Sequence, residues 1–117
     1  LGGIMPNIQI KTNIRVSNEK KRIIKNELGH IIEFIDGKSE KWLMVELSSD
    51  EDMWFQGSSE PCAYISLNIY GNSDGESYEK FTYAVTDLIN KELKVDIERI
   101  YVSYHETNYW GWKGENF

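Results

Sequence analysis

Two successive strand–helix–strand patterns limit the fold of this chain more than any other feature. In the first, residues 7–13 alternate apolar and polar side chains, residues 17–35 repeat apolar residues at helical spacing, and residues 42–47 alternate again. In the second, residues 62–70 and 99–105 alternate on either side of another helical pattern. Right-handed crossovers make the strands parallel within each pattern and place both helices on one face. We therefore predict an α+β fold, in which two β-α-β repeats form a four-stranded mixed sheet with two helices on one face.

Short signals mark the helix ends and support the repeat. Ser17 is predicted to cap the first helix, and Asp36-Gly37 to end it. Ser73 and Glu76 have the spacing of a capping box ahead of the second helix. The predicted inner faces consist of Ile24, Leu28, Ile31, Ile32 and Ile35 in the first helix, and Phe81, Ala84, Val85, Leu88 and Leu93 in the second. The residues leading into the second and fourth strands, 40–42 and 98–100, resemble each other.

The other face of the predicted sheet has no helix to cover it. It mixes polar and aromatic residues, namely Gln9, Lys11, Met44, Glu46, Tyr64, Ser66, Tyr101 and Ser103. A face of this composition is either an ordinary half-solvated surface or an interface. The residue pattern leaves both possibilities open.

Composition excludes several classes of function. The 117 residues fit one domain, and 19 acidic against 13 basic residues give a formal net charge of −6, which disfavours nucleic acid and anionic membranes as partners. An RNA-recognition domain would also need a basic and aromatic motif that the central strands lack. One cysteine, Cys62, and two histidines are too few for a structural metal site, so we predict no metal.

The sequence gives little information about where the protein is located. No apolar run reaches the roughly 20 residues of a membrane span, and the sequence has no classical secretion signal. We expect a cytoplasmic protein, with secretion by a route that needs no classical signal peptide left open.

Met5 is followed directly by Pro6, and a proline that begins a mature chain has a secondary amine able to act as a base. We expect residues 1–5 to be a leader or a non-native remnant that ends in an initiator-like Met5, and residues 6–117 to form a single domain. While residues 1–5 are attached, the Pro6 nitrogen is an amide and cannot take up a proton. This form is therefore expected to be weakly active or inactive.

Several motifs share the order and spacing of a known family. They are Met5-Pro6, Thr12-Asn13, Gly37-Lys38, residues 55–63, residues 99–102, and Gly111-Trp112 with Phe117. With them the chain from Met5 to Phe117 resembles the macrophage migration inhibitory factor branch of the tautomerase superfamily, which includes D-dopachrome tautomerase. The resemblance implies a homotrimer whose open sheet faces turn inward to form a barrel, with an active site at each subunit boundary. It also implies keto–enol tautomerisation of phenylpyruvate or D-dopachrome, without a cofactor.

The resemblance assigns roles to individual residues. Pro6 is the general base, and Lys38 supplies a cation that lowers the pKa of the proline amine and binds a substrate carboxylate. The implied substrate-binding residues are Tyr70, Tyr101, Ser103, Trp42, Trp110 and Phe117. Tyr70 would act through its backbone amide, and Tyr101 would come from the neighbouring subunit. Ser103 stands where the family has asparagine and Trp42 where it has tyrosine, so substrate preference stays open.

Other interpretations accompany this one. The resemblance also allows a secreted, cytokine-like ligand that acts by binding an immune-cell receptor, with vestigial tautomerase activity. Taken singly, Lys38 is a cation at a helix end, Tyr101 an interface aromatic, and Trp42 and Trp110 packing residues. The joint pattern favours a functional role for Pro6 and Lys38 first, and for Tyr101 third.

Overall fold

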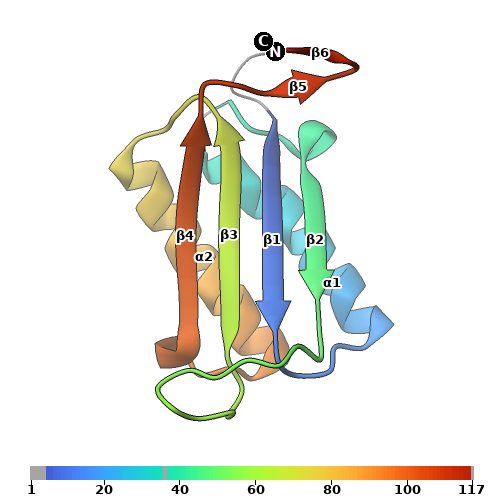
Figure 1. The fold of residues 1–117 in the computed structure, drawn as a ribbon, viewed down its shortest axis with the longest axis vertical. Helices are drawn as coiled ribbons and strands as arrows, with labels where there is room; N and C mark the ends of the chain where they lie inside the picture. The colour runs from blue at the N-terminus through green and yellow to red at the C-terminus, as the bar shows by residue number, and fades with distance from the viewer. Residues whose placement is uncertain (1–4, 36, 117) are drawn as a thin grey trace.

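The computed structural model describes residues 5–35 and 37–116, and it confirms the predicted α+β architecture (Figure 1). The first unit consists of β1 (Pro6–Thr12), α1 (Asn18–Ile31), the 3₁₀ turns η1 (Ile32–Phe34) and η2 (Glu40–Trp42), and β2 (Met44–Ser48). The second consists of β3 (Ala63–Tyr70), α2 (Gly75–Leu93), the 3₁₀ turn η3 (Ile97–Arg99) and β4 (Ile100–Thr107). A hairpin of β5 (Gly111–Trp112) and β6 (Glu115–Asn116) follows.

The four-stranded sheet has the strand order β2-β1-β3-β4. β1 pairs with β2, and β3 with β4, in parallel, as the crossover rule predicts. The two units join through β1 and β3, which are antiparallel, with Pro6 opposite Ile69 and Thr12 opposite Ala63. Both helices cover one face of the sheet, and no helix covers the other face in the described part of the chain (Figure 1). The start of β1 therefore lies at the same end of the sheet as the ends of β3 and β4.

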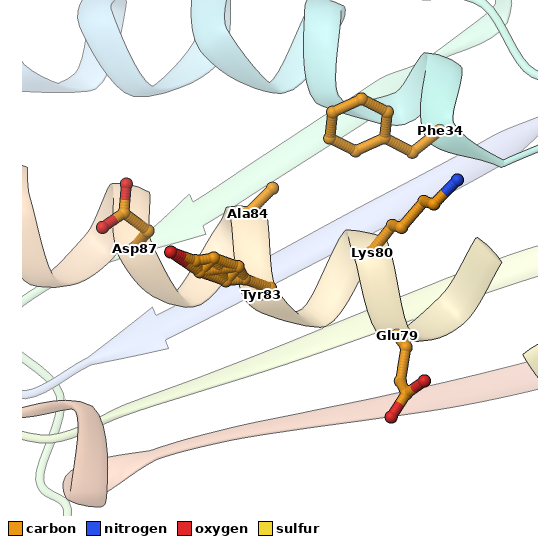
Figure 2. A pocket seen from close by; sticks show the side chains of 6 residues that line it. All are labelled: Phe34, Glu79, Lys80, Tyr83, Ala84 and Asp87. Atoms are coloured by element: carbon orange, nitrogen blue, oxygen red, sulfur yellow. The ribbon is translucent and has the colours of Figure 1, made fainter. Parts of the chain in front are cut away.

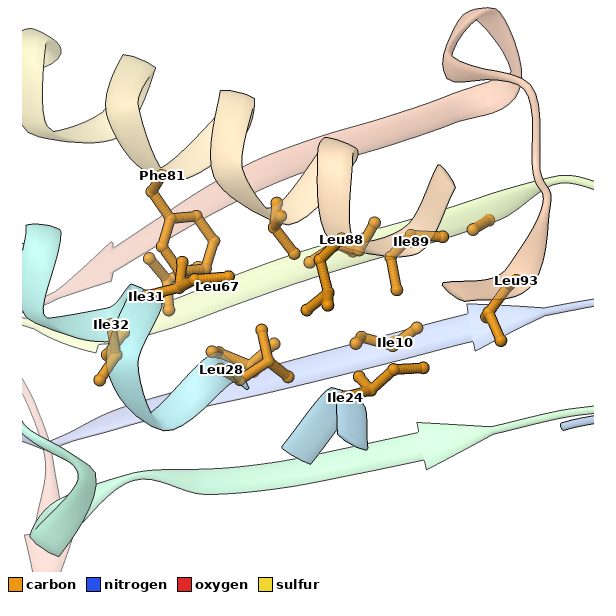
Figure 3. Close-up of a cluster of buried hydrophobic side chains, with 14 of the residues drawn as sticks. Ile10, Ile24, Leu28, Ile31, Ile32, Leu67, Phe81, Leu88, Ile89 and Leu93 are labelled. Atoms are coloured by element: carbon orange, nitrogen blue, oxygen red, sulfur yellow. The ribbon is translucent and has the colours of Figure 1, made fainter. Parts of the chain in front are cut away.

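The hydrophobic core lies between the helices and the inner sheet face (Figure 3). Alternate residues of β1 and β3, including Ile8, Ile10, Ile65 and Leu67, are at most 1% exposed, because every second side chain of a strand points to the same face. The predicted helix faces are buried against them, except that Ala84 is only half-buried. The two helical stripes and the strand alternation thus meet in one cluster, as predicted.

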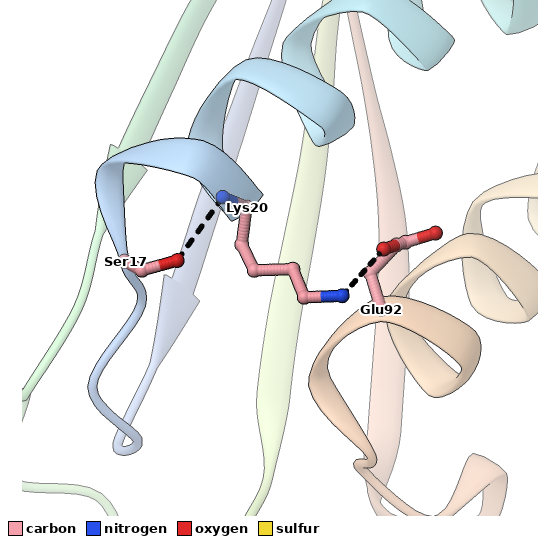
Figure 4. Close-up of polar contacts among 3 residues, drawn as sticks. All are labelled: Ser17, Lys20 and Glu92. Carbon is pink, nitrogen blue, oxygen red and sulfur yellow. Dashed lines mark hydrogen bonds and ion pairs between the residues drawn. The ribbon is translucent and has the colours of Figure 1, made fainter.

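One cap and one ion pair tie α1 to its surroundings (Figure 4). The Ser17 hydroxyl accepts a hydrogen bond from the Lys20 backbone N–H at 3.2 Å, which confirms the predicted cap. The Lys20 ammonium reaches Glu92 of α2 at 3.0 Å. Because the lysine side chain is 43% exposed, the pair stabilises the fold by no more than about 1 kcal/mol. Packing, not this ion pair, holds the helices together.

Several predicted boundaries shift in the structure. β2 begins at Met44 rather than at Trp42, because Glu40–Trp42 forms the turn η2, closed by the bond from Leu43 N to Glu40 O at 3.1 Å. α1 ends at Ile31, and η1 continues it. Of the predicted helix stop, Asp36 lies outside the described residues and Gly37 has a φ of 78°, which suits glycine. The turns η2 and η3 occupy equivalent places in the two units, in agreement with the predicted repeat.

The predicted capping box of α2 is wrong. Asp74, not Ser73, caps the helix, because its carboxylate accepts the Ser77 backbone N–H at 2.7 Å. The Ser73 hydroxyl is buried and has no hydrogen-bond partner in the described part of the chain. The helix therefore begins one residue later than a Ser73 cap would place it.

These two residues make a matched test of the cap. Asp74→Ala should lower Tm by several degrees, because the first turn of α2 loses its acceptor. Ser73→Ala should leave Tm unchanged or slightly raised, because it removes an unpaired buried hydroxyl. The hydrogen bond from Ser77 N–H lowers the pKa of Asp74, so the cap stabilises at neutral pH and its contribution is lost as pH falls through that lowered pKa. Thermal unfolding followed by circular dichroism measures both variants, and a larger loss for Ser73→Ala would contradict the assignment.

Candidate active site

Pro6, Lys38 and Tyr70 meet at one corner of the sheet. Pro6 is the first residue of β1 and is buried, and its partner in the ladder is Ile69, the neighbour of Tyr70. The Lys38 ammonium donates to the Tyr70 carbonyl oxygen at 3.5 Å. Lys38 comes from the connection between η1 and η2, so three separate segments build this corner. The structure thus brings together the two predicted catalytic residues and one predicted substrate-binding residue.

Lys38 is a buried cation. Lys38 is only 5% exposed. Burial lowers the pKa of its ammonium below the usual 10.5, because removing water penalises the charged form. The carbonyl contact at 3.5 Å is long for a hydrogen bond and compensates only in part. An anionic group that enters this corner would therefore gain a strong partner. This is the arrangement expected of a carboxylate-binding lysine.

Met5 occupies the same corner as Pro6. Met5 is 4% exposed, so it fills a buried position rather than extending into solvent. The peptide bond to Met5 also makes the Pro6 nitrogen an amide without basicity. In this form the corner has its lysine cation but no base.

An aromatic pair borders the same end of the sheet. The rings of Trp42 and Trp112 meet edge to face, with centroids 5.0 Å apart, and the Lys41 ammonium lies 5.3 Å from the Trp42 ring. Trp42 ends η2 and Trp112 lies in β5, and both elements lie at the Pro6 end of the sheet (Figure 1). The prediction named Trp42 but missed Trp112 as its partner.

Of the other two tail residues that we predicted, the structure describes only Trp110. Trp110 is half-buried and immediately precedes β5, while Phe117 lies outside the described residues. The family motif Gly111-Trp112 was the signal that could have identified Trp112. These two residues form β5, and the pairing of β5 with β6 fixes where the Trp112 side chain lies. The aromatic border therefore includes a residue that the sequence assignment left out.

Tyr101 lies at the opposite end of the sheet from Pro6. It pairs with Tyr64 of β3, and Tyr64 is in turn opposite Lys11 of β1. Lys11 is five residues beyond Pro6, which corresponds to about 17 Å along the strand. Within one chain, Tyr101 therefore cannot reach the Pro6 corner.

Ser103 belongs to a polar chain on the open face. Its hydroxyl is 2.6 Å from the Tyr64 hydroxyl and 2.9 Å from Nε2 of His105. The predictions left His105 without a role, and the structure makes it part of this chain. Ser103 thus bonds to residues of its own chain and does not contact Pro6.

A second polar network on the open face begins beside Pro6. The Asn7 amide donates to the Glu46 carboxylate at 2.9 Å, and Gln9 donates to the same oxygen at 3.1 Å. These bonds lower the pKa of Glu46, the bond from Asn7 most of all. The Asn68 amide donates to Asn7 at 3.0 Å. The part of the open face next to the corner is therefore an ordered polar surface.

A separate groove of about 630 Å³ lies on the helix layer between η1 and α2 (Figure 2). Phe34 faces Tyr83, Lys80 and Ala84 across it, while Glu79 points away on the other side of α2. None of the predicted site residues lines this groove. The residues 5–35 and 37–116 hold no cluster of three or more His, Cys, Asp or Glu suited to a metal ion, and none of their helices is long and apolar enough to cross a membrane.

The chain is a small α+β protein with three defining features. They are the antiparallel joint between two β-α-β units, the single helix layer, and the buried lysine beside the first strand. Residues 5–117 match the family model described as macrophage migration inhibitory factor (MIF), and the chain belongs to this family. The macrophage migration inhibitory factor of Meriones unguiculatus is 30% identical over 115 residues, which cover 97% of this chain and 99% of that protein. These findings confirm the resemblance that the motifs predicted.

Solved structures agree with the family assignment. MIF2 of Leishmania major has a TM-score of 0.92 and 31% sequence identity, and the match covers 99% of this chain and 100% of that one. A homologue from Prochlorococcus marinus has a TM-score of 0.79 and 26% identity, covering 95% of this chain and 98% of its own. The fold is therefore shared along nearly the whole chain.

Proposed function

We propose that this protein is a keto–enol tautomerase whose base is the amine of Pro6, and that it acts when Pro6 is the first residue. The observation that carries the proposal is the corner itself, where Pro6 and the buried cation of Lys38 adjoin the end of β3. We use the name processed protein for the chain that begins at Pro6.

Removal of Met5 has two effects in this proposal. It turns the Pro6 nitrogen from an amide into a secondary amine. It also empties the buried position that Met5 fills, where that residue is 4% exposed. A base and the space for a small substrate would thus arise together. The buried cation beside this space favours a substrate with a carboxylate, such as phenylpyruvate.

The proposed reaction moves one proton. The Pro6 nitrogen accepts a proton from the carbon next to the carbonyl, the C–H electron pair forms a C=C bond, and the carbonyl π pair moves to oxygen. The Lys38 cation lowers the energy of the negative charge on the substrate. The proline then returns the proton to the oxygen, which completes the conversion of keto form to enol without gain or loss of atoms.

The position of Tyr101 supports an active site made by two chains. Tyr101 is 61% exposed at the end of the sheet far from Pro6, so it is available to the corner of another subunit. A homotrimer whose open sheet faces turn inward would provide this contact and cover the polar network of Asn7 and Glu46. Light scattering should give the mass of three chains.

The test compares the processed protein with the chain that retains residues 1–5, each with its first residue identified by mass spectrometry. Phenylpyruvate tautomerisation, followed by ultraviolet absorbance of the enol, should be at least about 100-fold faster for the processed protein, since general base catalysis contributes at least this factor. D-dopachrome is the second substrate to assay. A trimeric processed protein without turnover of either substrate would contradict the proposal.

A further inference from the structure

Arg99 holds the turn that supports Tyr101. We propose that Arg99 is a positioning residue for substrate binding, which acts through Phe55 on the Tyr101 ring and thereby serves the active site of the neighbouring subunit. The inference rests on the proposed function, and it assigns a role to a residue that neither touches substrate nor lies near Pro6.

The guanidinium of Arg99 binds four backbone carbonyls. Nε donates to Pro61 O at 2.9 Å, one terminal nitrogen to Phe55 O at 3.1 Å, and the other to Ser58 O at 3.1 Å and Glu60 O at 3.0 Å. Only a planar group with several fixed N–H donors can bridge four carbonyls in this way. Arg99 therefore determines the path of residues 55–61.

Residues 55–61, which Arg99 binds, contain a tight turn. Phe55 and Ser58 exchange backbone hydrogen bonds of 2.9 and 3.0 Å, and the two residues between them, Gln56 and Gly57, have φ values of 52° and 73°. Positive φ at both central positions is the geometry of a type I′ turn, which reverses the chain within two residues. The Phe55 ring thus projects from a point that Arg99 fixes.

The Phe55 ring contacts both Arg99 and Tyr101 and so links the held turn to Tyr101. The guanidinium carbon of Arg99 lies 5.3 Å from the Phe55 ring centroid, and the Phe55 and Tyr101 centroids are 4.8 Å apart at an interplanar angle of 69°. Tyr101 is otherwise weakly confined, because it is 61% exposed and borders a cavity of about 130 Å³ together with Phe55 and Arg99. Loss of the Phe55 contact would let the ring sample other rotamers.

Arg99→Lys in the processed protein tests the role of the guanidinium. Lysine keeps the positive charge but cannot bind four carbonyls from one planar group. We expect KM for phenylpyruvate to rise about tenfold with kcat little changed, because a misplaced Tyr101 weakens binding of substrate and transition state alike. Arg22→Lys, at an exposed position of α1, is the matched control and should change neither constant.

A double variant separates positioning from general loosening. If Arg99 acts through Tyr101, adding Arg99→Lys to Tyr101→Ala should raise KM no further than Tyr101→Ala alone. Phe55→Leu keeps the backbone carbonyl that Arg99 binds but removes the ring, and it should reproduce the KM of Arg99→Lys. This variant keeps the proposal testable if Arg99→Lys does not fold. An additive effect of Arg99→Lys on Tyr101→Ala, or a normal KM for Phe55→Leu, would overturn it.

Mixed trimers test whether the effect crosses the subunit boundary. Arg99→Lys subunits supply Pro6, and Pro6→Gly subunits supply an intact Arg99 with Phe55 and Tyr101. Trimers reassembled from both should contain boundaries with the KM of the unmodified processed protein. A mixture that shows only the raised KM would place the effect within one subunit and overturn the inference. Inactivity of the unmodified processed protein would instead count against the proposed function.

Discussion

Pro6→Gly in the processed protein should lower kcat/KM for phenylpyruvate by about 100- to 10,000-fold, the usual contribution of a positioned base. The proline ring prevents rotation about its N–Cα bond and so fixes the direction of the nitrogen lone pair, while the ladder partner Ile69 holds the residue at the corner. Glycine lacks the ring, so its amine can turn away from the substrate. Stopped-flow absorbance of the enol measures the loss.

The pH dependence gives this prediction a second readout. The base acts only when the Pro6 amine is neutral, so kcat/KM of the processed protein should rise with pH through the pKa of that amine. It should fall again at higher pH, where Lys38 loses its proton at a pKa below 10.5. An unperturbed α-amine has a pKa of about 8, and the nearby Lys38 cation should lower the value for Pro6. The variant must keep its circular dichroism and its oligomeric mass. Full activity of Pro6→Gly would remove Pro6 from the mechanism.

Lys38→Met should lower kcat/KM by about 100-fold, because a substrate carboxylate loses its buried cationic partner, an interaction of about 2–5 kcal/mol when one member is truncated. Methionine has a similar length and leaves little space unfilled. The loss should be much smaller for a substrate ester, which has no carboxylate to pair. Equal losses for acid and ester would contradict the binding role of Lys38.

The same variant should be at least as stable as the parent at neutral pH. Burial lowers the pKa of Lys38, so the folded chain binds fewer protons than the unfolded chain between that lowered pKa and 10.5. The free energy of unfolding therefore rises with pH in this window, and below it the charged lysine costs stability. Lys38→Met removes both the cost and this part of the pH dependence. Urea unfolding at neutral pH and at about pH 10 compares the two proteins, and a strongly destabilised variant at neutral pH would contradict the argument.

Much of the fold follows from periodicity, because strand alternation and helical spacing report which side chains face the core. The joint between the two units does not, since the crossover rule sets strand direction only within each unit. The antiparallel pairing of β1 with β3 depends on tertiary packing, and it is this pairing that places Pro6 beside Ile69. The choice of Asp74 over Ser73 as cap was equally hidden, because both residues can cap a helix.

The candidate site was predictable to a smaller extent. Pro6 and Lys38 came from the family motifs, and their common corner agrees with that assignment. Trp112 was missed because the strand β5 is too short to give a periodic signal. The role of Arg99 was also hidden, because its partners are backbone carbonyls, which every residue type has. Side chains that bind the backbone leave little trace in a sequence.

If Pro6 acts as the proposed function requires, the burial of Met5 bears on when its amine can be exposed. An enzyme that cuts the bond between Met5 and Pro6 must reach two residues that are both buried once the chain has folded. Under the proposed function, cleavage would therefore compete with the folding of β1. Under the proposed function, chains that fold first would keep a blocked amine, so the active fraction would depend on the order of these two events.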